Sequence, residues 1–573
     1  MGTGLALGYR IKKWAPDWRI ILSAVLIVLS FPPFNFSFLI WICLIPWFFA
    51  LRRVRSMQAA LVQGIWLSFF MTVFGFYWVA FVLQEFGNLP WIVAFLALFL
   101  FGTFAQPQFI LFSPIFYVLA RGRLEISPSH DSKNHRHIPT LLSLGFAFFY
   151  AGLDWILPKL WTDTLGHAFY ASQYFKQAAD LGGAALLTVV VYLTNDLLWS
   201  LIDRLRSRKE PSYWPTIRFV LPQALIAISA ILAVEYYGVY RLKFLGPILD
   251  QPIDTLQVGV IQGNIGDFDK LASETGSRGA ARKILETFFT MSDQALRLTP
   301  KPEVLVWPET SYPSTFRTPQ NTDELFRDQS VEHYVKDRKF TLLFGGYDRY
   351  KQKDYNAFFF LSPHGESSLG SPGDLQIYRK NILLLFGEYI PGMESIKFLR
   401  EQFPQIGNFG RGEGPSVLKI YRDVSLGAKH PTELPAISVG PIICYEALFP
   451  NYVIASANLG SQLIMNITND SWFGPWGEPE LHLALTTFRS IETRLPQLRS
   501  TNTGISALIT ATGDMPQQTG IGKAEIMNVK VPITPPIWTL MKSWGDWFGR
   551  TAFVLGIIFL FFGYRKQTLI NKN

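Results

Sequence analysis

Cysteine is the scarcest residue in this chain of 573 residues, which contains only two, Cys43 and Cys444. Cys43 lies in an apolar run typical of a membrane span, so a structural disulfide with Cys444 is not expected and Cys444 is predicted to be a free thiol. Charged residues are also few, at 17% of the chain, against 49% hydrophobic residues. This balance is unlike that of a soluble domain and predicts that part of the chain lies in a bilayer.

Motifs that bind cofactors are missing as well. The sequence has no glycine-rich phosphate loop and no His or Cys cluster with metal-ligand spacing, so we expect no metal and no other cofactor. The net charge of +9 could indicate nucleic acid. However, the basic clusters fall in short loops between apolar segments, where the positive-inside rule places them, and we expect no nucleic-acid partner.

Eight apolar segments come close to the about 20 residues that a helix needs to cross a bilayer. They cover 19–34, 36–51, 58–83, 89–120, 138–160, 181–202, 219–240 and 547–564. The fourth is long and contains Gln106, Pro107 and Pro114, so a kink or re-entrant bend is predicted there. The first is not typical of a cleaved signal, because the next segment follows at once without a small-residue site between them.

The loops between these segments alternate in basic residues. One side holds Arg10, Lys12, Lys13, Arg52, Arg53, Arg55, Arg121, Arg123, Lys133, Arg136, Arg204, Arg206, Arg208, Lys209, Arg565, Lys566 and Lys572. On the other side, the loops 32–34 and 85–88 have none, and the aromatic loop 158–180 has only Lys159 and Lys176. The basic side is predicted to be cytoplasmic. The 158–180 loop is either an interfacial segment or an ordinary connection.

The long segment before the last span is predicted to be an extracytoplasmic α/β domain. Short β-branched runs separated by mixed helical stretches occur at 256–261, 304–307, 341–344, 463–467 and 505–510. We therefore expect a seven-span domain over 1–248, an α/β domain over 249–535, and a final span with a cytoplasmic tail over 536–573.

Cys444 follows directly on the apolar run Ile437–Ile443, and a polar pair comes before the next proline. Buried cysteine is often a small core hydrophobe. A side chain at a strand-to-helix elbow can also be exposed in a cleft while its backbone stays fixed, as a nucleophile requires. Which of the two applies depends on the residues that accompany Cys444.

Two further apolar strands end on charged residues. Glu309 follows Trp307-Pro308 and is either a surface turn residue or a general base. Lys380 precedes an uncharged run and is either a solvated cation or a partly desolvated ammonium that faces an oxyanion. Glu388, in a turn, could position Lys380 or the substrate.

A thiol nucleophile needs a base and an oxyanion donor, and this domain offers both. The backbone N–H of Tyr445 is a second candidate oxyanion donor. Because Glu309, Lys380 and Cys444 each end an apolar strand of one domain, chance is a poor explanation of the set.

These motifs carry a family resemblance. Trp307-Pro308-Glu309, Lys380 with Phe386-Gly387-Glu388-Tyr389-Ile390-Pro391, and Ile443-Cys444-Tyr445-Glu446 resemble the nitrilase superfamily, and more narrowly its membrane-embedded branch, the apolipoprotein N-acyltransferases. The resemblance extends over nearly the whole chain, with further motifs at 31–34, 75–79, 179–183, 258–265, 466–474 and 498–504.

The resemblance implies an α-β-β-α sandwich and a ping-pong acyl transfer in the bacterial inner membrane, with the catalytic domain on the periplasmic side. Glu309 would be the base, Cys444 the nucleophile and Lys380 the oxyanion partner. The implied donor is a glycerophospholipid, and the acceptor is the α-amine of a diacylglyceryl-modified apolipoprotein. We expect a monomer. The family also needs residues that match Glu388, Tyr445 and Glu446.

Trp472 and Phe473 are expected to be exposed aromatics, either a lid or acyl-chain contact or ordinary packing. Their loop and the 158–180 loop are the candidate lipid entry path. Two departures from the family pattern occur: Leu385 stands where proline is usual, and 122–137 is a polar insert. A membrane-tethered carbon–nitrogen hydrolase with the same three residues, and a catalytically silent lipoprotein-binding protein, remain alternatives.

Overall fold

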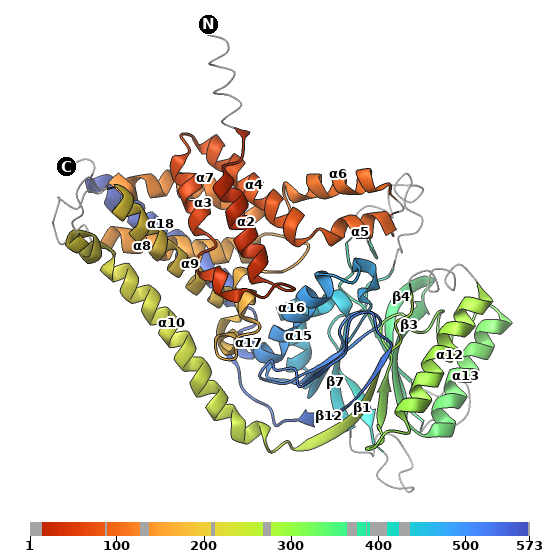
Figure 1. Cartoon of the computed structure of the whole chain (residues 1–573). Coiled ribbons are helices and arrows are strands. Elements are labelled where there is room, and N and C mark those ends of the chain that lie inside the picture. The colour runs from red at the N-terminus through yellow and green to blue at the C-terminus, as the bar shows by residue number, and fades with distance from the viewer. Residues whose placement is uncertain are drawn as a thin grey trace. The chain divides into compact units, whose positions relative to one another are not determined.

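The computed structural model describes residues 14–85, 87, 89–125, 137–207, 213–266, 277–363, 375–385, 387–389, 409–422 and 436–570. It divides into two compact units (Figure 1). The first comprises 1–242 with 546–573, and the second comprises 243–545.

The first unit is helical. Its elements are α2 (Trp18–Ser30), η1 (Ser37–Trp41), α3 (Ile45–Arg53), α4 (Met57–Gly75), α5 (Trp78–Glu85), α6 (Trp91–Gly102), α7 (Pro107–Glu125), α8 (His137–Ile156), η3 (Leu165–Phe169), η4 (Phe175–Ala178), α9 (Ala179–Ser207) and α18 (Phe548–Ile570). Helix α10 (Tyr213–Leu249) runs from this unit into the second.

Six helical stretches among the described residues are long and apolar enough to cross a membrane. They are Met57–Gly75, Trp91–Ala120, Ile138–Ile156, Phe175–Arg206, Val220–Leu249 and Phe548–Leu569. The other two predicted spans fall on shorter elements. The first corresponds to α2, whose 13 residues rise about 20 Å, less than the hydrocarbon core. The second divides into η1 and α3, with Pro46 in the first turn of α3.

The predicted break in the fourth segment is present. Helix α6 ends at Gly102 and α7 begins at Pro107, whereas Pro114 lies inside α7. The 158–180 loop folds into η3 and η4, and residues Leu165–Phe169 are buried. The ring of Phe169 lies 5.1 Å from that of Trp41 and 4.9 Å from that of Phe175, so this segment is packed into the first unit.

Small residues let the last helix pack closely in the first unit. A Cβ atom on Gly152 of α8 would lie 2.3 Å from the backbone of Phe553, and one on Gly556 of α18 would lie 2.4 Å from that of Phe149. Glycine at such crossings lets helix backbones approach each other. The C-terminal span is thereby bound to α8, far from it in the sequence.

The second unit holds two six-stranded sheets. The first has the order β12-β1-β2-β3-β4-β5, and its strands are β12 (Glu525–Ile533), β1 (Asp254–Gln262), β2 (Val304–Val306), β3 (Thr341–Tyr350), β4 (Lys353–Leu361) and β5 (Leu375–Arg379). The second has the order β11-β10-β9-β8-β7-β6, with β11 (Gln517–Gln518), β10 (Ala507–Ile509), β9 (Gln497–Thr501), β8 (Leu463–Thr468), β7 (Ala436–Ile443) and β6 (Leu418–Tyr421). Strands β1–β3 run parallel, as do β7–β9.

Each sheet has a helical layer on one face. Helices α12 (Arg278–Ala295) and α13 (Thr322–Arg338) lie side by side along the first sheet (Figure 1), where Phe288 and Val335 join a core with Trp307 and Phe344. Helix α15 (Pro450–Asn458) covers the second sheet, and α16 (Glu478–Thr493) packs against α15.

The uncovered sheet faces meet through β1 with β9 and β4 with β7. Gln262 joins the two sheets, since its Oε1 accepts hydrogen bonds from the Thr501 hydroxyl (3.0 Å) and the Ser506 hydroxyl (2.7 Å). The second unit is therefore an α/β domain of two sheets between helical layers. The predicted strands at 256–261, 304–307, 341–344 and 463–467 are all found.

Candidate active site

Cys444 lies at a sharp elbow. Strand β7 ends at Ile443, and Cys444 begins the 3₁₀ turn η6 (Cys444–Leu448) with φ of +49°. A residue with a Cβ atom rarely adopts this left-handed conformation, and such strain collects at functional sites. Both cysteines lack a disulfide, as predicted.

Glu446 holds this elbow against the strand end that carries Lys380. One of its oxygens, Oε2, accepts hydrogen bonds from the Ile443 N–H (2.9 Å) and the Tyr378 hydroxyl (2.7 Å). The other oxygen, Oε1, accepts from the N–H groups of Asn381 (2.6 Å) and Ile382 (3.1 Å). Burial raises the pKa of Glu446 to about 7, although the Ile443, Tyr378 and Asn381 donors and the Lys380 charge oppose the shift. Glu446 therefore joins the two sheets next to the site.

Lys380 lies between two carboxylates. Its Nζ is 3.2 Å from Oε1 of Glu309 and 2.8 Å from Oε1 of Glu388. Lys380 is 1% exposed and Glu309 is 5% exposed, so neither is the solvated surface residue of the alternative interpretation. A buried charge is tolerated when it is paired and hydrogen-bonded in this way.

Asn356 on β4 is a residue that the sequence analysis missed. Its side-chain amide donates to Oε1 of Glu309 (2.7 Å) and to Oε1 of Glu388 (2.8 Å), and its backbone carbonyl accepts from the N–H of Lys380. The only signal was a polar residue at the start of the apolar run Ala357–Leu361, which was not singled out as a strand.

Backbone contacts fix Glu309 from both sides. The N–H of Asn469, at the end of β8, donates to Oε2 of Glu309 (2.9 Å). On the other side Gly345 of β3 lies against Glu309, because a Cβ atom on Gly345 would come within 2.6 Å of the Glu309 Cα. The carboxylate is thus positioned by both sheets.

The charges at the site act on one another. Burial raises the pKa of Cys444 well above its usual value; Glu309 raises it further, while Lys380 opposes the shift. Burial alone would lower the pKa of Lys380, but Glu309, Glu388 and Cys444 outweigh it and raise that pKa. The resting site therefore holds a neutral thiol beside a charged ammonium, and the thiol needs a base before it can react.

The two predicted lid aromatics differ. Trp472 is 38% exposed, but Phe473 is 4% exposed, so the prediction that Phe473 is an exposed aromatic is wrong. Both belong to η7 (Asp470–Phe473), a 3₁₀ turn packed against α16. With three residues per turn, neighbouring side chains point about 120° apart, so only one of the two faces outward. Tyr445 is buried, and its ring lies 5.1 Å from that of Phe449.

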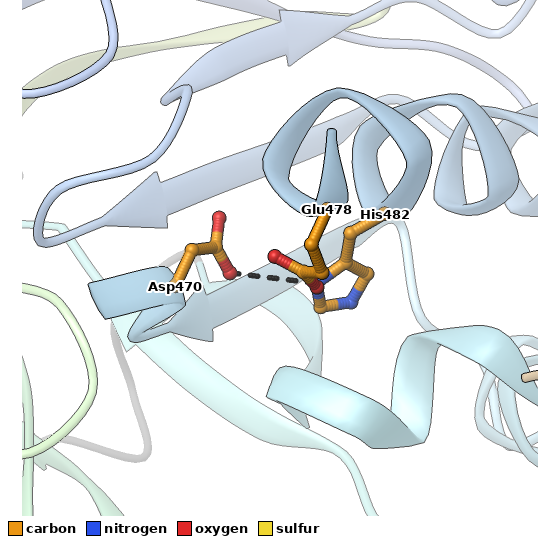
Figure 2. A group of neighbouring side chains, drawn as sticks. All are labelled: Asp470, Glu478 and His482. Carbon is orange, nitrogen blue, oxygen red and sulfur yellow. Dashed lines mark ion pairs between the residues drawn. The ribbon is translucent and has the colours of Figure 1, made fainter. Parts of the chain in front are cut away.

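A second buried polar cluster includes Asp470, the first residue of η7. The sequence analysis predicted no group of metal-ligating residues. Asp470, Glu478 and His482 place one potential ligand atom each within 4.8 Å of one another (Figure 2). The guanidinium of Arg499 brings a positive charge to the cluster, because its Nη2 lies 2.8 Å from Oδ2 of Asp470 and 3.2 Å from Nδ1 of His482.

Part of the predicted set lies outside the described residues. These are Phe386, Ile390 and Pro391 of the glutamate-bearing motif, residues 126–136 of the polar insert, and the basic residues Arg10, Lys12, Lys13, Lys133, Arg136, Arg208, Lys209 and Lys572. Leu385, the departure from the usual proline, forms an isolated bridge with Tyr389.

The site combines a buried thiol on an elbow with a carboxylate–ammonium pair from the facing sheet. This arrangement suits thiol chemistry, and the domain that carries it is of the carbon–nitrogen hydrolase class. A model of that class matches residues 257–533, and a model of the apolipoprotein N-acyltransferase N-terminal domain matches residues 23–197.

Relatives match nearly the whole chain. Apolipoprotein N-acyltransferase from Bdellovibrio bacteriovorus is 32% identical over 563 residues, which cover 94% of this chain and 93% of that protein. The enzyme of the same name from Geobacter metallireducens is 28% identical and covers 89% and 88%. Among solved structures, an amidase from Nesterenkonia sp. AN1 is 15% identical with a TM-score of 0.33, covering 48% of this chain and 93% of that one.

This chain belongs to the apolipoprotein N-acyltransferase family. It is an enzyme of the acyltransferase class that combines membrane-spanning helices with a carbon–nitrogen hydrolase domain.

Proposed function

We propose that this enzyme transfers a fatty acyl chain from a glycerophospholipid, through a thioester on Cys444, to the α-amine of the N-terminal diacylglyceryl-cysteine of apolipoproteins. The observation that carries the proposal is the buried Glu309–Lys380 contact of 3.2 Å, whose two charges both act on the Cys444 sulfur. Both substrates are lipids. Each buried CH₂ is worth about 0.8 kcal/mol, which favours an enzyme that works at the bilayer.

In the first half-reaction, Glu309 takes the proton of the Cys444 thiol, and the thiolate attacks the ester carbonyl of the phospholipid. The charge that develops on the carbonyl oxygen is stabilised by the Lys380 ammonium and by the backbone N–H of Tyr445. The ester C–O bond then breaks, Glu309 returns the proton to the leaving oxygen, and lysophospholipid departs. The acyl chain remains on sulfur as a thioester.

In the second half-reaction, the free α-amine of the diacylglyceryl-cysteine attacks the thioester carbonyl. Glu309 accepts the proton that the amine loses as the C–N bond forms, and the C–S bond breaks. The thiolate leaves and recovers that proton, which returns the site to its resting state. Glu388 supports both steps by holding Lys380, and Glu446 supports them by holding the Cys444 elbow.

The exposed indole of Trp472 suits a lid or an acyl-chain contact, and we assign Phe473 to the packing beneath it. The Trp472 loop and the 158–180 segment remain our candidates for the lipid entry path.

The alternating basic loops support a topology of eight spans in the bacterial inner membrane, with α2 and the η1–α3 segment as the two short ones. In this topology 1–248 form the seven-span domain, 249–535 the periplasmic catalytic domain, and 536–573 the last span with a cytoplasmic tail. We propose that the enzyme acts as a monomer. No residue of the mechanism requires a second chain.

A transfer assay tests this function. Purified enzyme is mixed with a phospholipid labelled in its acyl chain and with a diacylglyceryl-cysteine peptide that has either a free or an acetylated α-amine. The proposal predicts a labelled amide with the free amine and almost no labelled product with the blocked one. Release of labelled fatty acid at the same rate with both peptides would instead identify a hydrolase.

A further inference from the structure

Thr468 stands beside the nucleophile, at the end of the neighbouring strand. Strands β7 and β8 are parallel, with Ile443 paired to Ile467, so the next residues along the two strands are Cys444 and Thr468. Thr468 is fully buried, and hydrogen bonding by its hydroxyl acts to lower the pKa of Cys444. None of the steps above uses this hydroxyl.

The hydroxyl of Thr468 has a second partner. It donates to Oδ1 of Asp470 (3.0 Å), a carboxylate that is itself fully buried. Burial acts to raise the pKa of Asp470, but Arg499 and His482 outweigh it and lower that pKa to about 2. Asp470 is therefore an ionised acceptor at neutral pH.

Asp470 does not depend on Thr468 for its hydrogen bonds. Nη2 of Arg499 lies 3.1 Å from Oδ1 and 2.8 Å from Oδ2 of Asp470, and Nδ1 of His482 lies 3.4 Å from Oδ1. Figure 2 shows the side chains of His482 and Glu478 pointing from α16 toward Asp470. Gly504 leaves room for this carboxylate, since a Cβ atom there would lie 2.1 Å from Oδ2.

We propose that Thr468 is a catalytic residue. When Glu309 deprotonates the Cys444 thiol, Thr468 turns its hydroxyl proton from Asp470 toward the thiolate. Asp470 and Arg499 are the positioning residues of Thr468. A hydroxyl has one proton and two lone pairs, so it accepts from the thiol while it donates to Asp470. After the thiol proton has moved to Glu309, rotation about the C–O bond redirects the O–H toward sulfur. No proton leaves Thr468, and Asp470 keeps its contacts with Arg499 and His482.

The same segment also positions the base. The residue between Thr468 and Asp470 is Asn469, whose N–H donates to Glu309. The Asp470–Arg499 pair thus fixes a stretch of three residues, with one contact to the nucleophile and one to the base. The Arg499 guanidinium compensates the negative charge of the buried Asp470 carboxylate. Through this ion pair the cluster stabilises the site.

The test compares Thr468→Val, which removes the hydroxyl at nearly constant volume, with Thr468→Ser, which keeps it. Thr501→Val is the matched control, because Thr501 is a buried threonine paired with Thr468 in the β8–β9 ladder whose hydroxyl bonds Gln262 instead. Alkylation of Cys444 by iodoacetamide is followed against pH in a Cys43→Ala background, together with the rate of acyl-enzyme formation.

Thr468→Val is expected to slow acyl-enzyme formation about tenfold and to move the alkylation profile to higher pH, since a hydrogen bond to the charged thiolate is lost. Thr468→Ser should restore most of the rate of acyl-enzyme formation and most of the wild-type alkylation profile. Thr501→Val should leave the alkylation profile unchanged. An unchanged profile in Thr468→Val would overturn the assignment. A chelator that abolishes activity, with recovery on adding a divalent metal, would also overturn it, because the cluster would then hold a metal in place of the Arg499 contact.

The inference rests on the proposed function, but the two can fail separately. Alkylation of Cys444 reports on the sulfur without any acyl transfer. If Thr468→Val shifts the profile while the enzyme proves to be a hydrolase, the hydroxyl assignment stands and the transfer assignment falls.

Discussion

The regions around the two cysteines have burial in common and differ in almost everything else. The sulfur of Cys43, in the first unit, donates to the backbone carbonyl of Ile40 (3.3 Å), and the nearby Asn195 side chain bonds the backbone of Ile40 and Leu44. The polar side chains in that region hydrogen-bond backbone N–H and C=O groups. Around Cys444, in contrast, a carboxylate, an ammonium and a hydroxyl act on the sulfur, and the backbone at Cys444 is strained.

This contrast bears on what a buried thiol needs to act as the nucleophile that we propose. Burial by itself favours the neutral thiol and so works against reactivity. Reactivity requires a base that can take the proton and a positive charge that supports the anion, and both must be held in place. In the proposed mechanism the two sheets of the second unit share that task, with Glu309 and Lys380 on one and Cys444 and Thr468 on the other.

The largest expected effect separates the two cysteines. Cys444→Ala should lower N-acylation of a diacylglyceryl-cysteine peptide by about 10³-fold or more, because no thioester can form. Cys43→Ala should stay close to wild type, since among the described residues the Cys43 sulfur hydrogen-bonds a backbone carbonyl and no charged group. Retained N-acylation in Cys444→Ala would break the contrast between the two regions.

The next prediction sharpens the contrast through charge. Glu309→Gln and Lys380→Met should each slow acyl transfer by about 10²–10⁴-fold, since one removes the base and the other the oxyanion partner. Their effects on Cys444 should have opposite signs. Glu309 raises the pKa of Cys444 and Lys380 lowers it, so the alkylation profile should move to lower pH in Glu309→Gln and to higher pH in Lys380→Met.

A shift of both profiles in the same direction would contradict this account of the site. The measurement uses the Cys43→Ala background, so that iodoacetamide reports on Cys444 alone.

A smaller effect is expected from Asn356→Ala. The Asn356 amide bridges the carboxylates of the buried Glu309 and the half-buried Glu388, and its loss leaves each with one donor fewer. Acyl-enzyme formation should fall by about 10–100-fold, the cost of hydrogen bonds to charged groups. Asn528→Ala is a matched control on β12, because its amide donates instead to the carbonyl of Pro300. Equal losses in the two variants would argue for a general effect on the fold.

The smallest effect concerns the backbone that positions Glu309. Gly345→Ala would bring a Cβ atom within 2.6 Å of the Glu309 Cα, so the segment after β2 that carries Glu309 must move. We expect a loss of about 1–3 kcal/mol in the free energy of unfolding, together with slower acyl-enzyme formation. Gly279→Ala on α12 meets no atom within 4 Å and should be neutral or stabilising in a thermal unfolding experiment.

The sequence predicted those parts of the fold that local pattern determines. Apolar runs ended by polar residues located β1, β2, β3, β7 and β8, and with them Glu309 and Cys444. Contacts that depend on strand register could not be predicted from the sequence. Residue spacing shows neither the alignment of Cys444 with Thr468 nor the hydrogen bonds by which Asn356 bridges Glu309 and Glu388. Phe473 was misjudged for a similar reason. A glycine-bounded loop predicts exposure of its aromatics, but the 3₁₀ geometry of η7 turns one of them inward.

The membrane spans show the same division between what local pattern predicts and what it does not. Hydropathy located the long helices, and the Gln106–Pro107 break followed from a proline at a helix start. It did not show that 36–51 is split between η1 and α3, because hydrophobicity over a window does not distinguish one helix from two short ones.

The most direct test is to incubate the enzyme with phospholipid alone and map any acyl group by peptide mass spectrometry. The account predicts one fatty acyl chain as a thioester on the peptide that contains Cys444, stable in water and discharged when a diacylglyceryl-cysteine peptide with a free amine is added. An acyl group on another residue, or the absence of any adduct while acylated peptide still accumulates, would contradict it.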